Sequence, residues 1–323
     1  MTHLPTSKDV LAAAERIRSH VPVSPLFLSP GLSDLLGAEV WIKADCVSVL
    51  SAFKLRGALN HLLAAPPAEA AVTSSTGNHG QGVAYAARLL GRRSDVFVPE
   101  TSPLNKREAI RRFGATLHVH GRDLDDAKDK ARAFAADRNL PFVDDGESPH
   151  VIAGAGTIGL EIGNALPDAD LVYAPAGAAC LASGTALGLK AAGAAARVVA
   201  VQSAQTPCMV RSFHARRAIE HPVTTICDCL NQRIPPGLSL AAMIANVHDA
   251  IEVDDRDCLA AMHSALAVAH MLIEVGTAAC LAGAWARRRE TAGKKLVLLF
   301  SGANSDTDMI RRCLDTTPLG SGT

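Results

Sequence analysis

The chain has 323 residues, of which 48% are hydrophobic and 20% are charged, a composition typical of a globular protein and not of a disordered one. Lysine plus arginine equals aspartate plus glutamate, at 32 each, so the charge balance argues against a nucleic-acid or membrane-surface partner. Aromatic residues make up only 4%, too few for the stacking platforms that bind single-stranded nucleic acid.

Targeting signals and metal motifs are missing from the sequence. Residues 1–18 contain no basic stretch followed by an apolar run, so no signal peptide is expected, and no apolar run is long enough to cross a membrane. The eight cysteines are scattered, and the one close pair, Cys227 and Cys229, has no second pair to complete a zinc site. We therefore expect reduced thiols, no metal, and a cytoplasmic location.

Helix and strand patterns alternate along the chain. The first half predicts a helix at 8–20, a proline-rich connector at 22–30, strands at 40–44, 71–74, 95–98 and 116–119, and helices at 55–63, 78–90, 104–113 and 124–138. After a loop over 141–149, the second half predicts helices at 156–164, 183–192, 206–214, 255–269 and 274–288, strands at 171–174, 197–201 and 295–300, an irregular stretch at 224–236 and a final helix. This alternation predicts parallel sheets with crossover helices.

One lysine, Lys54, lies in the otherwise small and apolar run 51–57, between a predicted strand and a predicted helix. Burial in apolar surroundings lowers the pKa of a lysine, because it disfavours the charged form. The neutral amine can attack a carbonyl and form a Schiff base. The alternative for a lysine at a helix start is an ordinary surface residue.

Three loops follow predicted strands, where open α/β sheets place their ligands. The loop 74–81 carries hydroxyls and backbone N–H groups at a helix start, which suits an anion, although a simple N-cap is an alternative. The loop 175–184 consists of small residues that let backbone N–H groups approach a phosphate, or that form a tight turn. The loop 301–304 places Ser301 at a strand end, where it can contact a cofactor ring or cap a helix.

Four motifs of this chain resemble, in order and spacing, those of the pyridoxal-phosphate enzymes of the tryptophan-synthase-β class, fold type II. They are the lysine run, the Ser-Thr-Gly-Asn-His loop, the small-residue loop and the terminal Ser-Gly-Ala-Asn. Within that class the chain is similar to the threonine/serine dehydratase and serine racemase family, roughly from Val10 to Leu314. The resemblance implies an α/β fold with two open, mostly parallel twisted sheets and helices on both faces. It also implies a large cofactor-binding domain at 1–48 and 146–323, a small mobile domain at 49–145, and a possible homodimer.

The resemblance also implies a role for each motif residue. Lys54 forms the Schiff base with pyridoxal 5'-phosphate and moves the Cα proton of a small amino-acid substrate. Phe53 and Asn78 flank the ring, Asn78 bonds its 3-hydroxyl, and Ser301 meets the pyridine nitrogen. The phosphate is held by backbone N–H groups of Gly177, Ala178, Ala179, Cys180 and Leu181. The substrate carboxylate is surrounded by Ser75, Thr76, Asn78 and His79.

Several motif positions depart from the family pattern. Ser51 stands where the family has glycine, Ala52 stands where it has serine, and only Gly177 remains of a run of four glycines. Alanine and cysteine still supply N–H donors, so phosphate binding is expected as long as that backbone needs no positive φ. Where some relatives bind a divalent cation through acidic residues, this chain has Gln202 and Cys208, so that metal site is expected to be lost.

The expected activity is that of an ammonia-lyase (dehydratase) that converts a β-hydroxy-α-amino acid, through an aminoacrylate, to a 2-oxo acid and ammonia. Threonine, serine, a β-aryl serine and hydroxyaspartate are all open as substrates, with Arg56 and Arg233 as candidates for holding a second carboxylate. Arg56 is more simply a structural residue on the helix after Lys54. Racemases of the family carry serine where this chain has Thr76, whose β-branch restricts the hydroxyl, so we place dehydration above racemisation. A non-catalytic sensor of pyridoxal phosphate or amino acids is the third alternative.

Overall fold

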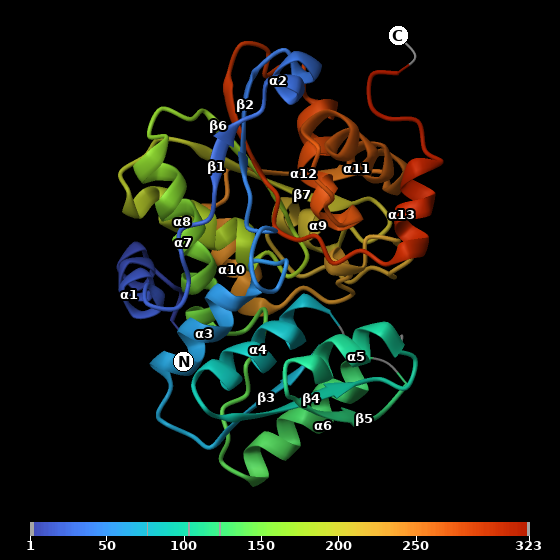
Figure 1. Cartoon of the computed structure of the whole chain (residues 1–323). Helices are drawn as coiled ribbons and strands as arrows, with labels where there is room; N and C mark the ends of the chain where they lie inside the picture. Colours follow the sequence, from blue (N-terminus) through green and yellow to red (C-terminus); the bar gives the residue numbers. More distant parts are fainter. Residues whose placement is uncertain (1–2, 76, 103, 123, 322–323) are drawn as a thin grey trace.

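The computed structural model describes residues 3–75, 77–102, 104–122 and 124–321. They form two open sheets, and Figure 1 shows the larger one above the smaller. The larger sheet has six strands in the order β1-β2-β9-β6-β7-β8. Its strands are β1 (Leu26–Leu28), β2 (Glu39–Lys43), β6 (Leu171–Pro175), β7 (Arg197–Ser203), β8 (Asp249–Val253) and β9 (Lys295–Leu299). β1 pairs antiparallel with β2, and the other neighbours pair in parallel.

Both chain ends contribute to the larger sheet. β2 lies beside β9 with Val40 opposite Leu296, and β9 lies beside β6 with Val172 opposite Val297. The strands β6 and β9 are buried almost throughout, which explains their continuous apolar sequences. Because β2 and β9 are neighbours, the loop after Lys43 and the loop after Leu299 leave the sheet at the same edge.

Helices cover both faces of the larger sheet. One core, on the side of α2 (Pro30–Leu36), α11 (Asp255–Ala269), α12 (Val275–Ala286) and α13 (Thr307–Leu314), includes Tyr173, Leu298 and Phe300. The core on the opposite face includes Val172 and Leu299 and is covered by helices of the second half of the chain. These helices are α7 (Pro149–Ala165), α8 (Cys180–Ala191), α9 (Cys208–Ala215) and α10 (Gly237–Asn246).

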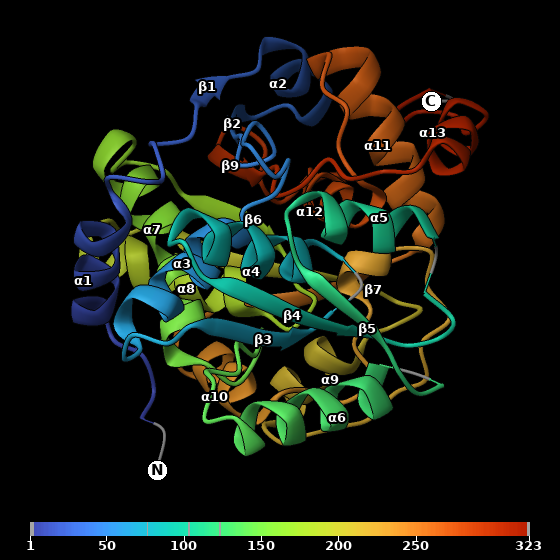
Figure 2. The same ribbon diagram turned by 60° about the horizontal axis from the view of Figure 1, so that its bottom comes forward.

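The smaller sheet is three-stranded and parallel, in the order β3-β4-β5. It consists of β3 (Ala70–Ser74), β4 (Arg93–Val98) and β5 (Thr116–Val119). In Figures 1 and 2, α4 (Asn78–Leu89) and α5 (Leu104–Arg112) lie on the face toward the larger sheet, and α6 (Leu124–Asp137) lies on the outer face. The fold is therefore α/β with helices on both faces of two mostly parallel sheets, as predicted.

The helix that begins at Lys54, α3 (Lys54–Ala64), is anchored by a buried ion network. Arg56 donates from Nε to Asp45 at 2.7 Å and from Nη1 to Glu161 of α7 at 2.5 Å, and its side chain is only 3% exposed. Lys43 adds a second contact to Glu161 at 2.5 Å. The guanidinium is fully engaged inside the protein, so Arg56 is a structural residue, and its candidacy for a substrate carboxylate was wrong.

Most predicted elements are present with ends shifted by one to three residues, but some were missed. The helix predicted at 156–164 begins earlier, at Pro149, because Ser148 caps it through a bond from the Val151 N–H. The elements β1, α2, α10 and β8 were not predicted, since short or proline-flanked segments carry weak periodicity. The remaining helix, α1 (Ser7–Ile17), ends three residues before its predicted end, and η1 (Asp228–Leu230) lies in the stretch predicted to be irregular. No helix within the described ranges is long and apolar enough to cross a membrane.

Candidate active site

A cavity of about 230 Å³ lies between the two sheets, at the carboxyl ends of their strands. It brings together most of the predicted site residues, including those of all three loops. They are Phe53, Lys54, Ser75, Asn78, His79, Gly177, Ala178, Ala179, Cys180, Leu181 and Ser301. Thr76, the remaining predicted substrate residue, lies outside the described residues. The roles of these side chains stay predictions, but their convergence on one cavity is a structural fact.

Lys54 is held at the first position of α3 by contacts to the loop that follows β9. The Phe53 N–H donates to the Ser301 carbonyl at 3.0 Å, and Ala52 bridges to Gly302. The Lys54 ammonium lies 4.8 Å from the centre of the Phe53 ring, and its side chain is 15% exposed. At Gly82 of α4 an added Cβ would lie 3.1 Å from the Lys54 Cβ, so this glycine allows α4 to approach closely.

The charge state predicted for Lys54 was wrong. Burial does act to lower the pKa of Lys54, but the neighbouring Asp145 carboxylate more than compensates, and the pKa is raised above its usual range. The Lys54 Nζ lies 2.7 Å from Asp145 Oδ1 and 2.5 Å from Oδ2. The ammonium in turn holds the pKa of Asp145 well below its usual range, against the effect of burial. The lysine is therefore an ion-paired ammonium in this structure and not a neutral amine in an apolar pocket.

The small-residue loop forms an anion site at the N-terminus of α8. Among the described residues, the backbone amides of 177–182 donate to no backbone carbonyl, whereas the Ser183 amide already bonds the Ala179 carbonyl. Unpaired amides at a helix N-terminus suit a phosphate. A Cβ on Gly177 would lie 2.6 Å from the Cys229 carbonyl oxygen, which explains why this one glycine is needed.

The expectation that this loop needs no positive φ was wrong. Ala179 caps α8 with φ 58° and ψ 9°, in the left-handed region. This conformation costs a non-glycine residue roughly 1–2 kcal/mol. Ser51, at another position where relatives have glycine, is also left-handed, with φ 50°. The chain thus keeps the backbone shape that glycine usually provides while carrying side chains in its place.

Asn78, at the first position of α4, is fixed by two residues from distant parts of the chain. Its Nδ2 donates to Glu274 Oε1 at 2.9 Å and to Oε2 at 3.2 Å, and its Oδ1 accepts from Asn304 Nδ2 at 2.7 Å. Glu274 is buried, and burial together with the nearby Asp228 carboxylate raises its pKa to about 7. These contacts determine which face the Asn78 amide presents to the cavity.

Ser301 provides a hydroxyl, not a carboxylate, at the end of β9. Its Oγ lies 3.0 Å from Thr277 Oγ1 on α12, and the side chain is almost completely buried. A hydroxyl can donate to or accept from a ring nitrogen without forcing that nitrogen to be protonated. The role predicted for this hydroxyl, a hydrogen bond to the pyridine nitrogen of the cofactor, stays a prediction.

The hydroxyl loop supplies both cavity-facing and structural groups. Ser75 lines the cavity, and its Oγ accepts from the Gly77 N–H at 3.2 Å. His79 is 4% exposed, and its Nε2 lies 3.0 Å from the Val143 carbonyl oxygen. Ser75 and His79 were predicted to surround the substrate carboxylate, and that role stays a prediction.

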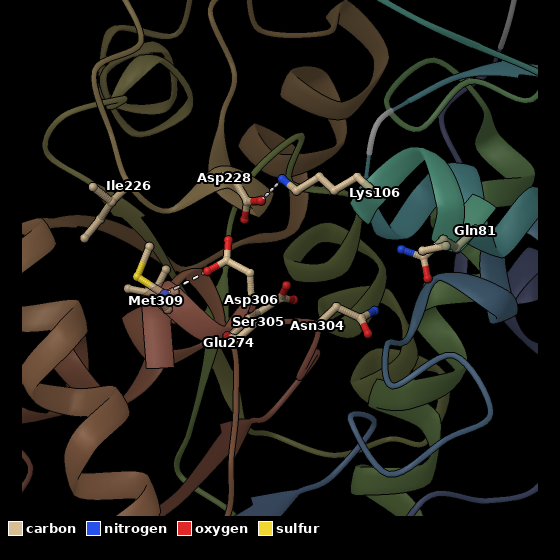
Figure 3. Close-up of a pocket in the computed structure, with 11 residues that line it drawn as sticks. Gln81, Lys106, Ile226, Asp228, Glu274, Asn304, Ser305, Asp306 and Met309 are labelled. Carbon is tan, nitrogen blue, oxygen red and sulfur yellow. Dashed lines mark hydrogen bonds and ion pairs between the residues drawn. The ribbon is translucent and has the colours of Figure 1, made fainter. Parts of the chain in front are cut away.

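A second cavity, of about 360 Å³, adjoins the first and is shown in Figure 3. Lys106 of α5 reaches across it and pairs with Asp228, which links the side of the small sheet to that of the large one. The two cavities share Gln81, Lys106, Asp228, Glu274 and Asn304.

Gln202 and Cys208 occupy the positions at which the metal site was predicted to be lost. Gln202, at the predicted lost metal position, accepts from the Met209 and Val210 N–H groups at 3.0 and 3.2 Å, so its oxygen already caps α9. Asp228, Cys229 and Glu274 are close enough together to share an ion, but the Lys106 ammonium already pairs with this group at Asp228. Arg233 pairs with Glu220 and is not among the described residues that line the cavity, so its candidacy for a second carboxylate is not supported.

Two residues central to this geometry, Asp145 and Glu274, were missed by sequence reasoning. Asp145 lies in a loop 91 positions after Lys54, and Glu274 lies 196 positions after Asn78. The only sequence signal for Asp145 was an acidic pair in a loop that faces strand ends. Glu274 was placed at the start of a helix, but nothing in the sequence connected it with Asn78.

The fold and this set of loops define the fold type II class of pyridoxal-phosphate proteins. Residues 17–302 match the family described as pyridoxal-phosphate dependent enzyme. The L-threonine ammonia-lyase of Thermotoga maritima is 31% identical over 98% of this chain and 80% of its own length. The L-threo-3-hydroxyaspartate ammonia-lyase of Saccharomyces cerevisiae is 30% identical over 94% of both chains. Among solved structures, maize serine racemase superposes with a TM-score of 0.89 at 25% identity, over 97% of this chain and 98% of the other.

The chain belongs to the family of pyridoxal-phosphate dependent enzymes, and pyridoxal 5'-phosphate is its cofactor. Relatives that are named ammonia-lyases align with nearly the whole length of this chain, so the chain is a lyase of that family. The unpaired amides of 177–182 and the Ser301 hydroxyl fit the phosphate and the ring nitrogen of this group.

Proposed function

We propose that the protein is a dehydratase that releases water and ammonia from a β-hydroxy-α-amino acid and leaves a 2-oxo acid. The observation that carries this proposal is the meeting of the Lys54 ammonium, the free amides at the start of α8 and the Ser301 hydroxyl in one cavity. Ammonia-lyases of threonine and of hydroxyaspartate among the relatives support the reaction class.

Each group has a distinct task in this proposal. Lys54 holds the cofactor through its Nζ and, once released, takes the proton from the substrate Cα as a general base. The amides of 177–182 hold the phosphate, and Ser301 bonds the ring nitrogen as a neutral partner. Ser75 and the N-terminal amides of α4 receive the substrate carboxylate. When bound, pyridoxal phosphate supplies an electron sink for the Cα carbanion.

The cavity restricts the charge of the substrate side chain. Two further cations line it, Lys106 and Lys128, and each is paired: Lys106 with Asp228, and Lys128 with Asp144 at 2.9 Å. A second substrate carboxylate would have to displace one of these aspartates. We therefore propose that substrates with an uncharged side chain, such as threonine, serine or an aryl serine, are preferred to hydroxyaspartate.

The small sheet with α4, α5 and α6 is proposed to form the mobile domain at 49–145, with the rest of the chain as the large domain. The Lys106–Asp228 pair is one of the contacts that would have to break when this domain opens. Closure would bring the Ser75 loop onto the substrate carboxylate and exclude water.

The proposal is tested by a panel assay of the cofactor-loaded protein. L-Threonine, L-serine, threo-phenylserine and threo-3-hydroxyaspartate are each incubated with it, and 2-oxo acid, ammonia and the enantiomer ratio of the remaining substrate are measured. We expect 2-oxo acid and ammonia in equal amounts from an uncharged substrate, and none with Lys54→Ala. Loss of optical purity without oxo acid would indicate a racemase, and cofactor binding without either change would indicate a sensor.

A further inference from the structure

Asp145 joins Lys54 to a second nitrogen base, His79. Its Oδ1 lies 2.7 Å from the Lys54 Nζ and 3.4 Å from the His79 Nδ1. The three groups come from α3, α4 and the loop before α7, and all three line the cavity. Lys54 and Asp145 are partly open to the cavity, with 15% and 29% of their side chains exposed, whereas His79 is 4% exposed.

The hydrogen bond on the far side of the ring fixes how His79 faces Asp145. Its Nε2 lies 3.0 Å from the Val143 carbonyl oxygen, which can only accept, so Nε2 carries a hydrogen. In the neutral ring, Nδ1 is then a bare acceptor. It is buried, has no hydrogen-bond partner, and faces a carboxylate oxygen, which is a second acceptor. One added proton on Nδ1 would turn that unpaired acceptor into a donor to Oδ1.

The surrounding charges make this added proton depend on Lys54. Burial lowers the pKa of His79, the Asp145 carboxylate raises it, and the Lys54 ammonium lowers it again. The other titratable groups near the ring are Asp144 and His61. Asp144 is itself paired with Lys128 and Arg132 at 2.9 and 3.0 Å, and burial lowers the pKa of His61 to about 4. Lys54 is therefore the one nearby positive charge that would be lost during the proposed reaction.

We propose that Asp145 and His79 act together as the acceptor for the proton that Lys54 must release before its Nζ can bond a carbonyl carbon. The proton leaves Lys54 Nζ for Asp145 Oδ1, and the same oxygen then passes it to His79 Nδ1. One N–H bond at Lys54 breaks and one forms at His79, so the total charge is unchanged. Asp145 ends as a carboxylate paired with an imidazolium instead of an ammonium. In this role Asp145 is a catalytic residue, because it touches the reacting nitrogen, and His79 is a buried proton store.

The inference rests on the proposed role of Lys54, but its first test needs neither cofactor nor turnover. Histidine ring signals of the cofactor-free, isotope-labelled full chain are followed by NMR across pH, and the His79 signal is assigned with His79→Gln. Lys54→Met removes the ammonium at similar side-chain length, and Lys54→Arg retains the positive charge. We expect the His79 titration midpoint in Lys54→Met to lie roughly 1–3 pH units above that of the wild type and of Lys54→Arg. Adding Asp145→Asn to Lys54→Met should abolish the rise.

An equal midpoint in the wild type and Lys54→Met would overturn the inference, as would a rise that survives Asp145→Asn. If Lys54→Met does not fold, as judged by the signals of the other histidines, Lys54→Gln provides the same comparison. In that case the His79 midpoint should be higher in Lys54→Gln than in the wild type, and adding Asp145→Asn should abolish the rise. If these shifts are observed but the protein makes no 2-oxo acid, the proposed reaction is wrong, whereas the inference that Asp145 and His79 accept the proton still holds.

Discussion

The buried carboxyl group of Glu274 should make the stability of the protein depend on pH in a specific window. Burial and the Asp228 carboxylate raise the pKa of Glu274 from 4.5 to about 7 in the folded chain, and the hydrogen bonds from Asn78 and Cys229 only partly oppose this. At about 1.4 kcal/mol for each pH unit, this difference corresponds to about 3 kcal/mol. The protonated Glu274 carboxyl contributes fully to stability below pH 4.5, where it is protonated in both the folded and the unfolded chain. This contribution is lost as the pH rises to about 7, because the unfolded chain ionises first.

The substitution Glu274→Gln removes this ionisation and leaves an amide oxygen to accept from Asn78 Nδ2. Relative to the wild type, the free energy of unfolding of the variant should rise by about 3 kcal/mol between pH 4.5 and pH 7 and then stay level. The assay is urea unfolding of the cofactor-free protein at closely spaced pH values, followed by the fluorescence of Trp41 and Trp285. Glu220→Gln, at a glutamate side chain that is 65% exposed, is the matched control. A difference between Glu274→Gln and wild type that stays constant over this range would refute the reasoning.

Ala179→Gly should stabilise the protein by up to about 1 kcal/mol in urea unfolding, because relief of the left-handed strain is partly offset by the freedom that glycine adds to the unfolded chain; a loss of stability would contradict the strain argument. Arg56→Met should destabilise it by roughly 3–5 kcal/mol, because the carboxylates of Asp45 and Glu161 are left buried and unpaired; thermal unfolding checks this, and a loss below about 1 kcal/mol would show that the network is dispensable. Dialysis against EDTA should leave turnover unchanged, since Gln202 is committed to capping α9; activity that falls and is restored by a divalent cation would show that a metal site exists.

Most of the fold and the loops of the site could be predicted from local sequence patterns. The strand at 295–299 and the loop at 301–304, for example, follow from a continuous apolar run that ends in small polar residues. The loop 177–181 was recognisable because small residues between a strand and a helix leave backbone amides accessible. Such features depend on residues a few positions apart, so periodicity and turn chemistry are enough to find them. The backbone conformation was not predictable in the same way: Ala179 adopts a positive φ at the N-cap of α8, although alanine disfavours this region.

The sequence by itself predicted the class of fold, Lys54 as the Schiff-base lysine and the ordered set of loops, because these are encoded by short patterns. Only the tertiary structure decided the electrostatics of the site. It placed Asp145 against Lys54 and Glu274 against Asn78, across 91 and 196 positions of chain. A pKa depends on the burial of a group and on charges within a few ångströms, whatever their separation in sequence. For this reason Lys54, which the sequence alone predicted to be a neutral amine, is an ion-paired ammonium in the folded protein.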